Sequence, residues 1–108
     1  MNTLGKTILI TGASRGIGRA IATSCAPYFD TMLLTCKKSE TELLSLKEEL
    51  ENAHRITCIP FIGDMGDPAF VSSIFEGITQ IDTVINNAGI SHIGLLSDMS
   101  IEEWNNVI

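Results

Sequence analysis

A glycine-rich stretch near the start of the chain constrains the fold most strongly. It follows Thr7–Ile10, a short apolar run rich in β-branched residues, which is typical of a buried parallel strand. The stretch itself reads Thr11-Gly12-Ala13-Ser14-Arg15-Gly16-Ile17-Gly18 and leads into a helical pattern. A buried strand that turns through glycines into a helix predicts the first unit of an α/β fold with a parallel sheet.

Each of the three glycines has a predicted task. Gly12 allows the sharp turn off the strand, Gly16 lets the backbone approach a pyrophosphate, and Gly18 lets the helix pack closely on the sheet. The free N–H groups at the start of the helix attract negative phosphate charge. The stretch therefore predicts a dinucleotide-binding loop, a prediction that needs support from the rest of the chain.

The rest of the chain alternates strands with helices. The expected elements are a helix from Ile17 that Pro27 ends, strand Thr31–Cys36, a helix over 40–51, strand Arg55–Gly63, a helix with Asp67 as N-cap and Pro68 in its first turn, strand Ile81–Ile85, and a helix that opens at Ser100. The apolar or small residues expected to share a helix face are Ile17, Ala20, Ile21, Ser24 and Cys25; Leu43, Leu44, Leu46 and Leu50; and Phe70, Val71, Ile74, Phe75 and Ile78.

Pro60 lies within the third expected strand and limits where that strand can lie. Proline cannot donate to a strand ladder, so it belongs at a sheet edge or a bulge. In a doubly wound sheet the third strand is an edge strand. We therefore expect an α/β fold with a Rossmann-like, doubly wound parallel sheet, whose N-terminal portion has four strands of order 3-2-1-4 with flanking helices. Residues 1–108 are expected to form one dinucleotide-binding domain.

Charge and cysteine content exclude several functional classes. A net charge of −6 argues against binding to nucleic acid or to an anionic membrane. The cysteines Cys25, Cys36 and Cys58 lack the spacing of a disulfide framework or a zinc site, so we predict no metal site and expect a reducing, cytoplasmic location. The first apolar run is too short for a signal sequence or a membrane span.

Two further motifs support the dinucleotide-binding prediction. Gly63-Asp64-Met65 closes the third strand, and Asn86-Asn87-Ala88-Gly89 follows the fourth. Together with the glycine-rich stretch, in this order, they resemble the short-chain dehydrogenase/reductase family over essentially the whole chain. Within that family the sequence, including Glu102-Glu103-Trp104-Asn105, is most similar to the 3-oxoacyl-(acyl-carrier-protein) reductases. The alternative is a Rossmann-like domain with a different task, such as a methyltransferase.

The end of the second strand indicates which cofactor is bound. NAD(H) is usually held by a carboxylate about 20 residues after the glycine motif. Here the strand ends in Thr35-Cys36-Lys37-Lys38 without a carboxylate. Lys37, Lys38 and Arg15 are suited to the 2′-phosphate of NADP(H), which we therefore expect in preference to NAD(H). Alternatively, these cations are only solvated loop residues.

The motif and the resemblance together give a set of expected cofactor contacts. The resemblance implies that Asp64 lies near the adenine ring, with a strand-end cap as the alternative, and that Asn87 contacts the cofactor. Asn86 also follows a strand end, where ligands bind in such sheets, with the alternative that its amide only ties neighbouring strand-end loops together. The complete set is Gly12, Ser14, Arg15, Gly16, Ile17, Gly18, Lys37, Lys38, Asp64, Met65, Asn87, Ala88 and Gly89.

Catalytic residues are not expected within this chain. In the family that the sequence resembles, a Tyr-x-x-x-Lys motif, a serine and an asparagine assist hydride transfer between the nicotinamide and a carbonyl carbon. Tyr28 is the only tyrosine, and Met32 stands four residues after it, so the motif is absent. The resemblance places the catalytic residues beyond Ile108, and we expect the 108-residue chain to be truncated before the catalytic part and inactive by itself.

The resemblance nevertheless implies an enzyme as the parent protein. That protein is expected to be an NADP(H)-dependent oxidoreductase acting on a carbonyl or alcohol substrate, with a 3-oxoacyl thioester as a candidate, and to form a homo-oligomer, a tetramer or dimer. The alternative is a non-catalytic dinucleotide-binding or redox-sensing module that retains only the cofactor loop.

Overall fold

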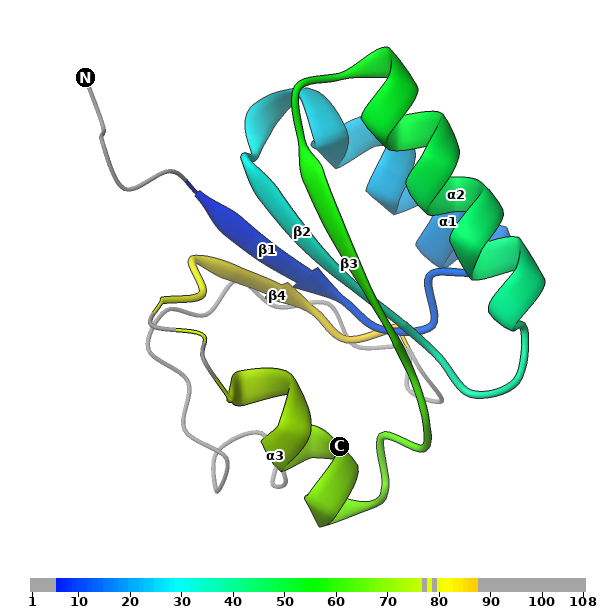
Figure 1. Ribbon diagram of the computed structural model, residues 1–108, viewed down its shortest axis with the longest axis vertical. Coiled ribbons are helices and arrows are strands. Elements are labelled where there is room, and N and C mark those ends of the chain that lie inside the picture. The colour runs from blue at the N-terminus through cyan, green and yellow to red at the C-terminus, as the bar shows by residue number, and fades with distance from the viewer. Residues whose placement is uncertain (1–5, 77, 79, 88–108) are drawn as a thin grey trace.

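The computed structural model describes residues 6–76, 78 and 80–87. In chain order the elements are β1 (Thr7–Ile10), α1 (Gly16–Cys25), a short 3₁₀ helix η1 (Ala26–Tyr28), β2 (Thr31–Cys36), α2 (Glu40–Ala53), β3 (Thr57–Ile62), α3 (Pro68–Phe75) and β4 (Thr83–Ile85). The strands form one parallel sheet of order β3-β2-β1-β4 (Figure 1). The predicted fold class and strand order are confirmed. The helix expected from Ser100 lies outside the described residues.

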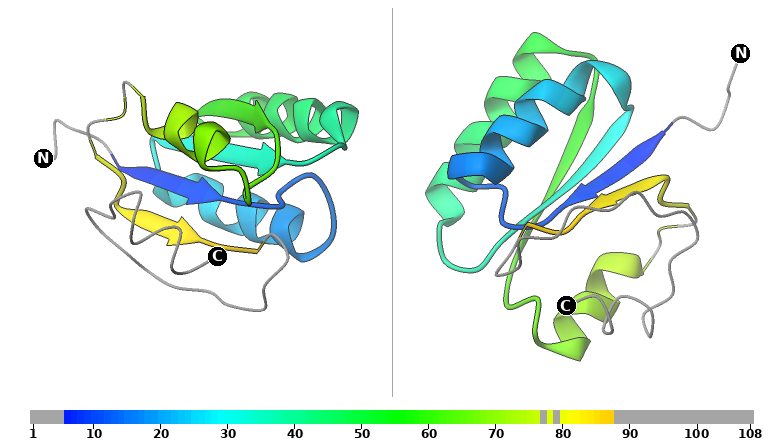
Figure 2. Two further views of the ribbon diagram at one scale, coloured as in Figure 1. Left: turned by 90° about the horizontal axis from the view of Figure 1, so that it is seen from below. Right: turned by 180° about the vertical axis from the view of Figure 1, so that it is seen from behind.

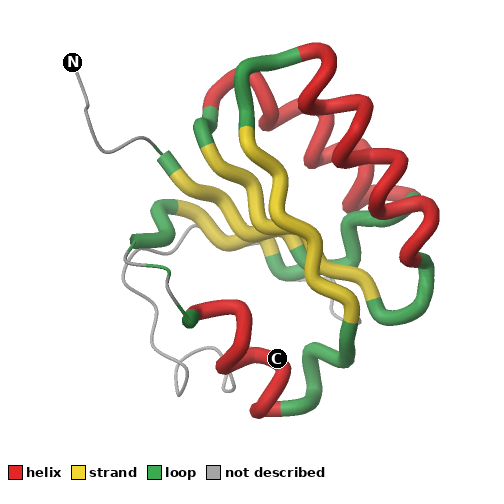
Figure 3. The backbone as a smooth tube through the Cα atoms, in the orientation of Figure 1, coloured by secondary structure: helices red, strands yellow, loops and turns green. Residues whose placement is uncertain are grey.

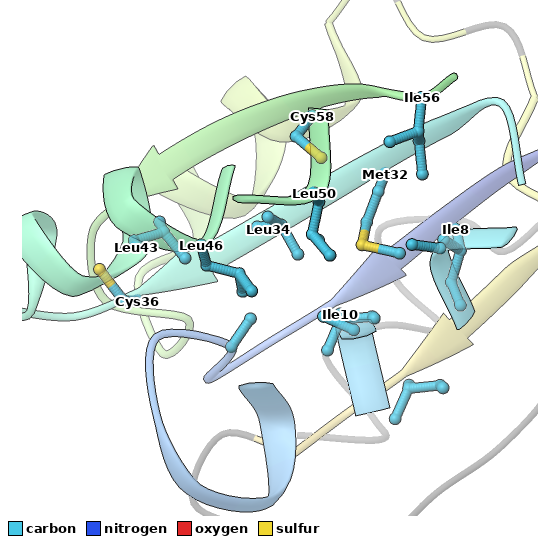
Figure 4. Close-up of a cluster of buried hydrophobic side chains, with 14 residues drawn as sticks. Ile8, Ile10, Met32, Leu34, Cys36, Leu43, Leu46, Leu50, Ile56 and Cys58 are labelled. Atoms are coloured by element: carbon cyan, nitrogen blue, oxygen red, sulfur yellow. The ribbon is translucent and has the colours of Figure 1, made fainter. Parts of the chain in front are cut away.

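Helices cover both faces of the sheet. Successive residues of a strand point to opposite sides, so each strand supplies apolar side chains to both faces. Ile8 and Leu34 pack in one buried cluster with side chains of α1 and α2, shown in Figure 4. Leu9 and Leu33 pack in a second cluster with side chains of α3. Figure 2 shows the resulting layers, with α1 and α2 on one face of the sheet and α3 on the other.

Helix α1 buries a different face from the one predicted. Three of the expected positions are exposed: Ile17, Ala20 and Ser24. The helix instead buries Gly18 and Ala22 and half-buries Ile21 and Cys25, which have the same helical spacing displaced by one residue. The reason is the close approach of Gly18 to the backbone of Gly12, which turns the smallest side chains toward the sheet.

The other helices follow the predicted patterns with small differences. In α2, Leu43, Leu46 and Leu50 are buried, whereas Leu44 is 41% exposed and lies off the buried face. In α3 the side chain of Asp67 accepts a hydrogen bond from the Ala69 N–H at 3.0 Å, as expected of an N-cap. The helix ends at Phe75, so Ile78 packs against the second cluster from the following segment.

Strand β3 is the edge strand that Pro60 predicts. In the described residues it pairs only with β2, and Pro60 lies opposite Leu34 in that ladder. On the side of Cys58, α2 supplies the hydrogen bonds: the Cys58 N–H donates to Glu51 Oε2 at 2.8 Å, and its carbonyl accepts from Lys47 Nζ at 2.9 Å. Lys47 and Glu51 also form an ion pair at 2.9 Å. The two side chains together satisfy one peptide donor and one acceptor of the edge strand.

We expect this contact to make stability dependent on pH. The hydrogen bond from Lys47, and then the one from the Cys58 N–H, lower the pKa of Glu51. A lowered pKa in the folded state stabilises the fold above the pKa of the unfolded state, about 4.3 for glutamate. That contribution is lost as the pH falls through the folded-state value.

Urea unfolding of the native chain and of Glu51→Gln, between pH 7 and pH 3, measures this contribution. The native chain should be more stable at neutral pH, and the gap should close below about pH 4.3. Glu48→Gln, at an exposed position of the same helix, is the control. A gap that stays constant across this range contradicts the prediction.

Candidate functional site

A cleft of about 500 Å³ lies where the carboxyl ends of the parallel strands meet, at the place where open α/β sheets bind ligands. It is lined by Gly12, Ser14, Arg15, Cys36, Lys37, Lys38, Ser39 and Asn87. Six of the predicted site residues are therefore brought together: Gly12, Ser14, Arg15, Lys37, Lys38 and Asn87. Cys36 and Ser39, which flank the two lysines in the sequence, were not among the expected cofactor contacts.

The remaining predicted residues lie elsewhere or outside the described part of the chain. Gly16, Ile17 and Gly18 form the first turn of α1, just behind the lining residues. Met65 is only 7% exposed and belongs to the second buried cluster, not to the cleft. Two expected contacts lie outside the described residues: Ala88 and Gly89.

The backbone of the glycine-rich loop needs glycine at two turns. Gly12 and Gly16 have φ angles of 62° and 65°, in the left-handed region that other residues rarely adopt. The loop is fastened to β2 by Thr35, whose carbonyl accepts from the Ala13 N–H at 2.9 Å and whose hydroxyl accepts from the Gly12 N–H at 3.4 Å. Sequence reasoning missed this role of Thr35, which has no motif to signal it.

Gly18 allows helix α1 to lie directly against the backbone of Gly12. A Cβ atom at this position would lie 2.1 Å from the Gly12 carbonyl oxygen and 2.7 Å from Asn87 Nδ2. Asn87 Nδ2 itself donates to the Gly12 carbonyl at 3.2 Å. The glycine-rich loop, the start of α1 and the segment after β4 are thus packed together, as the predicted task of Gly18 requires.

A buried threonine joins β1 to the segment after β4. The Thr11 hydroxyl donates to Asn86 Oδ1 at 3.0 Å and accepts from the Asn87 N–H at 2.8 Å. Asn86 therefore ties neighbouring strand ends together, which is the structural alternative raised for it. Among the described residues no hydrogen-bond partner meets Asn86 Nδ2, which is buried. Thr11, the first residue of the motif, thus holds the segment after β4 in place beside the glycine-rich loop.

We expect Thr11→Val to lower the free energy of unfolding by about 2 kcal/mol, because it removes the partner of the buried Asn86 Oδ1 and of the partly buried Asn87 N–H. Thr11→Ser keeps the hydroxyl and is the control. Urea unfolding of the three proteins measures the difference. An equal loss in both variants would assign the effect to packing of the methyl group and contradict the prediction.

Three cations surround the cleft, and one carboxylate stands close to them. Arg15, Lys37 and Lys38 are all exposed. Lys37 Nζ lies 3.8 Å from Asp64 Oδ2, and Asp64 Oδ1 accepts from the Gly66 N–H at 2.8 Å, as a residue capping the end of β3 does. Because exposed pairs at this distance are weak, Lys37 is available to a phosphate dianion. The adenine contact of Asp64 stays a prediction.

Cys36 lines the cleft as a neutral group. Burial raises the pKa of its thiol, an effect that a backbone hydrogen bond at Ser39 opposes only in part. A protonated thiol is a poor nucleophile, so Cys36 contributes shape and not covalent chemistry. In the described ranges no cluster of three or more His, Cys, Asp or Glu side chains could hold a metal ion. Nor does any helix there have the length and apolar character needed to cross a membrane.

Comparisons of the sequence identify relatives over nearly the whole chain. A family model described as short chain dehydrogenase matches residues 6–108. An L-xylulose reductase from Aspergillus niger is 41% identical over 89% of this chain and 37% of its own length. A 3-oxoacyl-(acyl-carrier-protein) reductase from Escherichia coli is 38% identical over 100% of this chain and 44% of its own length. The chain thus spans less than half the length of these relatives.

Solved structures share the fold. A short-chain dehydrogenase from Sphingobium yanoikuyae in complex with NADPH has a TM-score of 0.69 and 28% identity, covering 82% of this chain and 36% of that one. A short chain dehydrogenase from Burkholderia cenocepacia in complex with NADP has a TM-score of 0.68 and 31% identity, covering 91% of this chain and 41% of the other.

Proposed function

Because the chain belongs to the short-chain dehydrogenase family, we propose that it forms the NADP(H)-binding part of an oxidoreductase that acts on a carbonyl or alcohol substrate. The observation that carries the proposal is the cleft in which Arg15, Lys37 and Lys38 stand beside a glycine-rich loop. A pyrophosphate and a 2′-phosphate are the anions that such a loop and such cations recognise.

The residues present fit this cofactor in two respects. The missing Cβ of Gly18 lets the first turn of α1 pack directly against the glycine-rich loop, which turns at Gly12 through a positive φ. Lys37 and Lys38 directly follow β2, where a protein that selects NAD(H) usually has a carboxylate. NADP(H) would supply hydride chemistry, and the chain would bind and orient it.

Each part of the cofactor has an assigned place in the proposal. The loop from Gly12 to Gly16 and the first turn of α1 hold the pyrophosphate, with the positive end of the helix facing it. Arg15, Lys37 and Lys38 hold the 2′-phosphate. Asn87, two residues after β4, lines the cleft beside Gly12 and would contact the cofactor there.

Titration of the chain with NADPH and with NADH tests the cofactor assignment. The two ligands differ only in the 2′-phosphate, so each serves as the control for the other. A phosphate held by charge-assisted hydrogen bonds predicts that NADPH binds at least about tenfold more tightly. Equal affinities, or tighter binding of NADH, would show that the lysines are solvated loop residues and contradict the assignment.

For the substrate we propose a 3-oxoacyl thioester, a proposal supported by the Escherichia coli reductase that aligns with all of this chain. The relative from Aspergillus niger, an L-xylulose reductase, supports a sugar carbonyl as the competing candidate. NADPH oxidation with an acetoacetyl thioester and with L-xylulose, in any longer gene product that contains this chain, distinguishes the two. Binding of NADPH without turnover of either would favour a non-catalytic module.

A further inference from the structure

Arg19 contacts both the glycine-rich loop and helix α2. Its Nη1 donates to the Ser14 carbonyl at 3.1 Å and to the Glu42 carbonyl at 2.9 Å. Its Nη2 pairs with the Glu49 carboxylate. One guanidinium thus joins the glycine-rich loop to two points of α2, and its planar fork of donors is suited to hold such points in a fixed geometry.

One of these points, Ser14, lies in a wall of the cleft, and the other two lie in α2, the helix that directly follows the second wall. One wall is the loop with Gly12, Ser14 and Arg15, and the other is the segment 36–39, which leads into α2 at Glu40. Figure 3 shows both loops leaving the sheet at the carboxyl ends of β1 and β2. Arg19 is not among the lining residues, so it connects the walls from behind without reaching the ligand.

The far end of the loop depends on this connection. Thr35 fastens the loop at Gly12 and Ala13, directly after β1. Beyond these residues, the carbonyl of Ser14 is held by Arg19, in a loop whose two positive-φ glycines give it conformational freedom. The side chain of Arg19 is 29% exposed and that of Glu49 is 62% exposed, so the ion pair itself adds little to stability.

We propose that Arg19 is a positioning residue that fixes the separation of the two cleft walls and thereby sets the affinity for a ligand spanning both. The inference rests on the proposed function, in which the pyrophosphate lies on the loop and the 2′-phosphate lies between the lysine wall and the side chain of Arg15. NADPH needs the loop backbone and the lysine wall at once, whereas adenosine 2′-monophosphate meets only Lys37, Lys38 and the exposed side chain of Arg15, which is long enough to follow the phosphate. Misplaced walls therefore weaken NADPH much more than the smaller ligand.

Binding of both ligands to the native chain and to Arg19→Met tests this inference. NADPH should bind roughly tenfold more weakly to the variant, the size of effect typical for loss of a supporting contact, with adenosine 2′-monophosphate changed less than about twofold. Arg55→Met is the matched control. It removes the same charge next to the amino end of β3, whereas the cleft lies at the carboxyl ends of the strands. It should leave the ratio of the two affinities unchanged.

A second variant keeps the test decisive if Arg19→Met does not fold. Arg19→Gln is shorter and can keep one carbonyl contact but not the connection to α2, so it should also lower the affinity for NADPH selectively. Equal weakening of both ligands, or unchanged NADPH binding in a folded variant, overturns the inference. If the native chain itself binds no NADPH, the proposed function fails first, which is a distinguishable result.

Discussion

Gly18→Ala should lower the free energy of unfolding by about 3 kcal/mol, the upper end of the cost of forcing an extra methyl group into a packed site. The new Cβ would lie 2.1 Å from the Gly12 carbonyl oxygen and 2.9 Å from the Gly12 carbonyl carbon, both backbone atoms that cannot turn away. Helix α1 must therefore move off the loop. Since that movement opens the phosphate-binding turn, we also expect NADPH binding to be lost.

Two other glycines provide graded controls for this experiment. At Gly16 nothing lies within 4 Å of an added Cβ, but the φ angle of 65° makes Gly16→Ala strained by about 1–2 kcal/mol. At Gly66 the added atom would meet only the carboxylate oxygen of Asp64, at 3.3 Å. Urea unfolding should rank Gly18→Ala as the most damaging. A loss no larger than that of Gly66→Ala would mean that the helix shifts without cost.

Lys37→Asp should reverse the cofactor preference. The substitution places a carboxylate at the end of β2, where it repels the 2′-phosphate and can accept hydrogen bonds from both ribose hydroxyls. We expect the affinity for NADPH to fall about a hundredfold and the affinity for NADH to rise, so that NADH becomes the tighter ligand. Fluorescence or calorimetric titration with each cofactor measures the ratio.

The control for this substitution is Lys6→Asp. Lys6 is exposed and precedes the amino end of β1, whereas the cleft lies at the carboxyl ends of the strands. Its replacement changes the net charge by the same amount. It should weaken both cofactors equally and slightly, because distant exposed charges are screened. If Lys37→Asp also weakened both equally, Lys37 would act only through the overall charge, and its assignment to the 2′-phosphate would be wrong.

Features that depend on backbone chemistry were predictable from the sequence. Pro60 lacks a donor, which is why it could be placed on an edge strand, and that placement agreed with the strand order expected of a doubly wound sheet. Asp67 and Pro68 marked the start of α3 for a similar reason, since each has a strong preference at a helix start. In such cases one residue type restricts the local structure almost regardless of its surroundings.

Features that depend on contacts between distant segments were not predictable in the same way. The buried face of α1 is turned because Gly18 meets Gly12, a contact that helical periodicity cannot reveal. Thr35 and Arg19 fasten the loop through backbone carbonyls and N–H groups, which carry no signature in the sequence. Of the eight residues that line the candidate site, six were predicted from the sequence, whereas the supports behind them required the structure.

The contacts of Lys47 and Glu51 with Cys58 protect the edge of the sheet at β3 from pairing with a further strand. An edge strand normally has unpaired N–H and C=O groups that can hydrogen-bond to another strand, including one from a second copy of the chain. At Cys58 those groups are already engaged by the ammonium and the carboxylate, which together imitate the neighbouring peptide. A new strand could pair there only after breaking both contacts. Extension of this sheet beyond β3 is therefore disfavoured at Cys58.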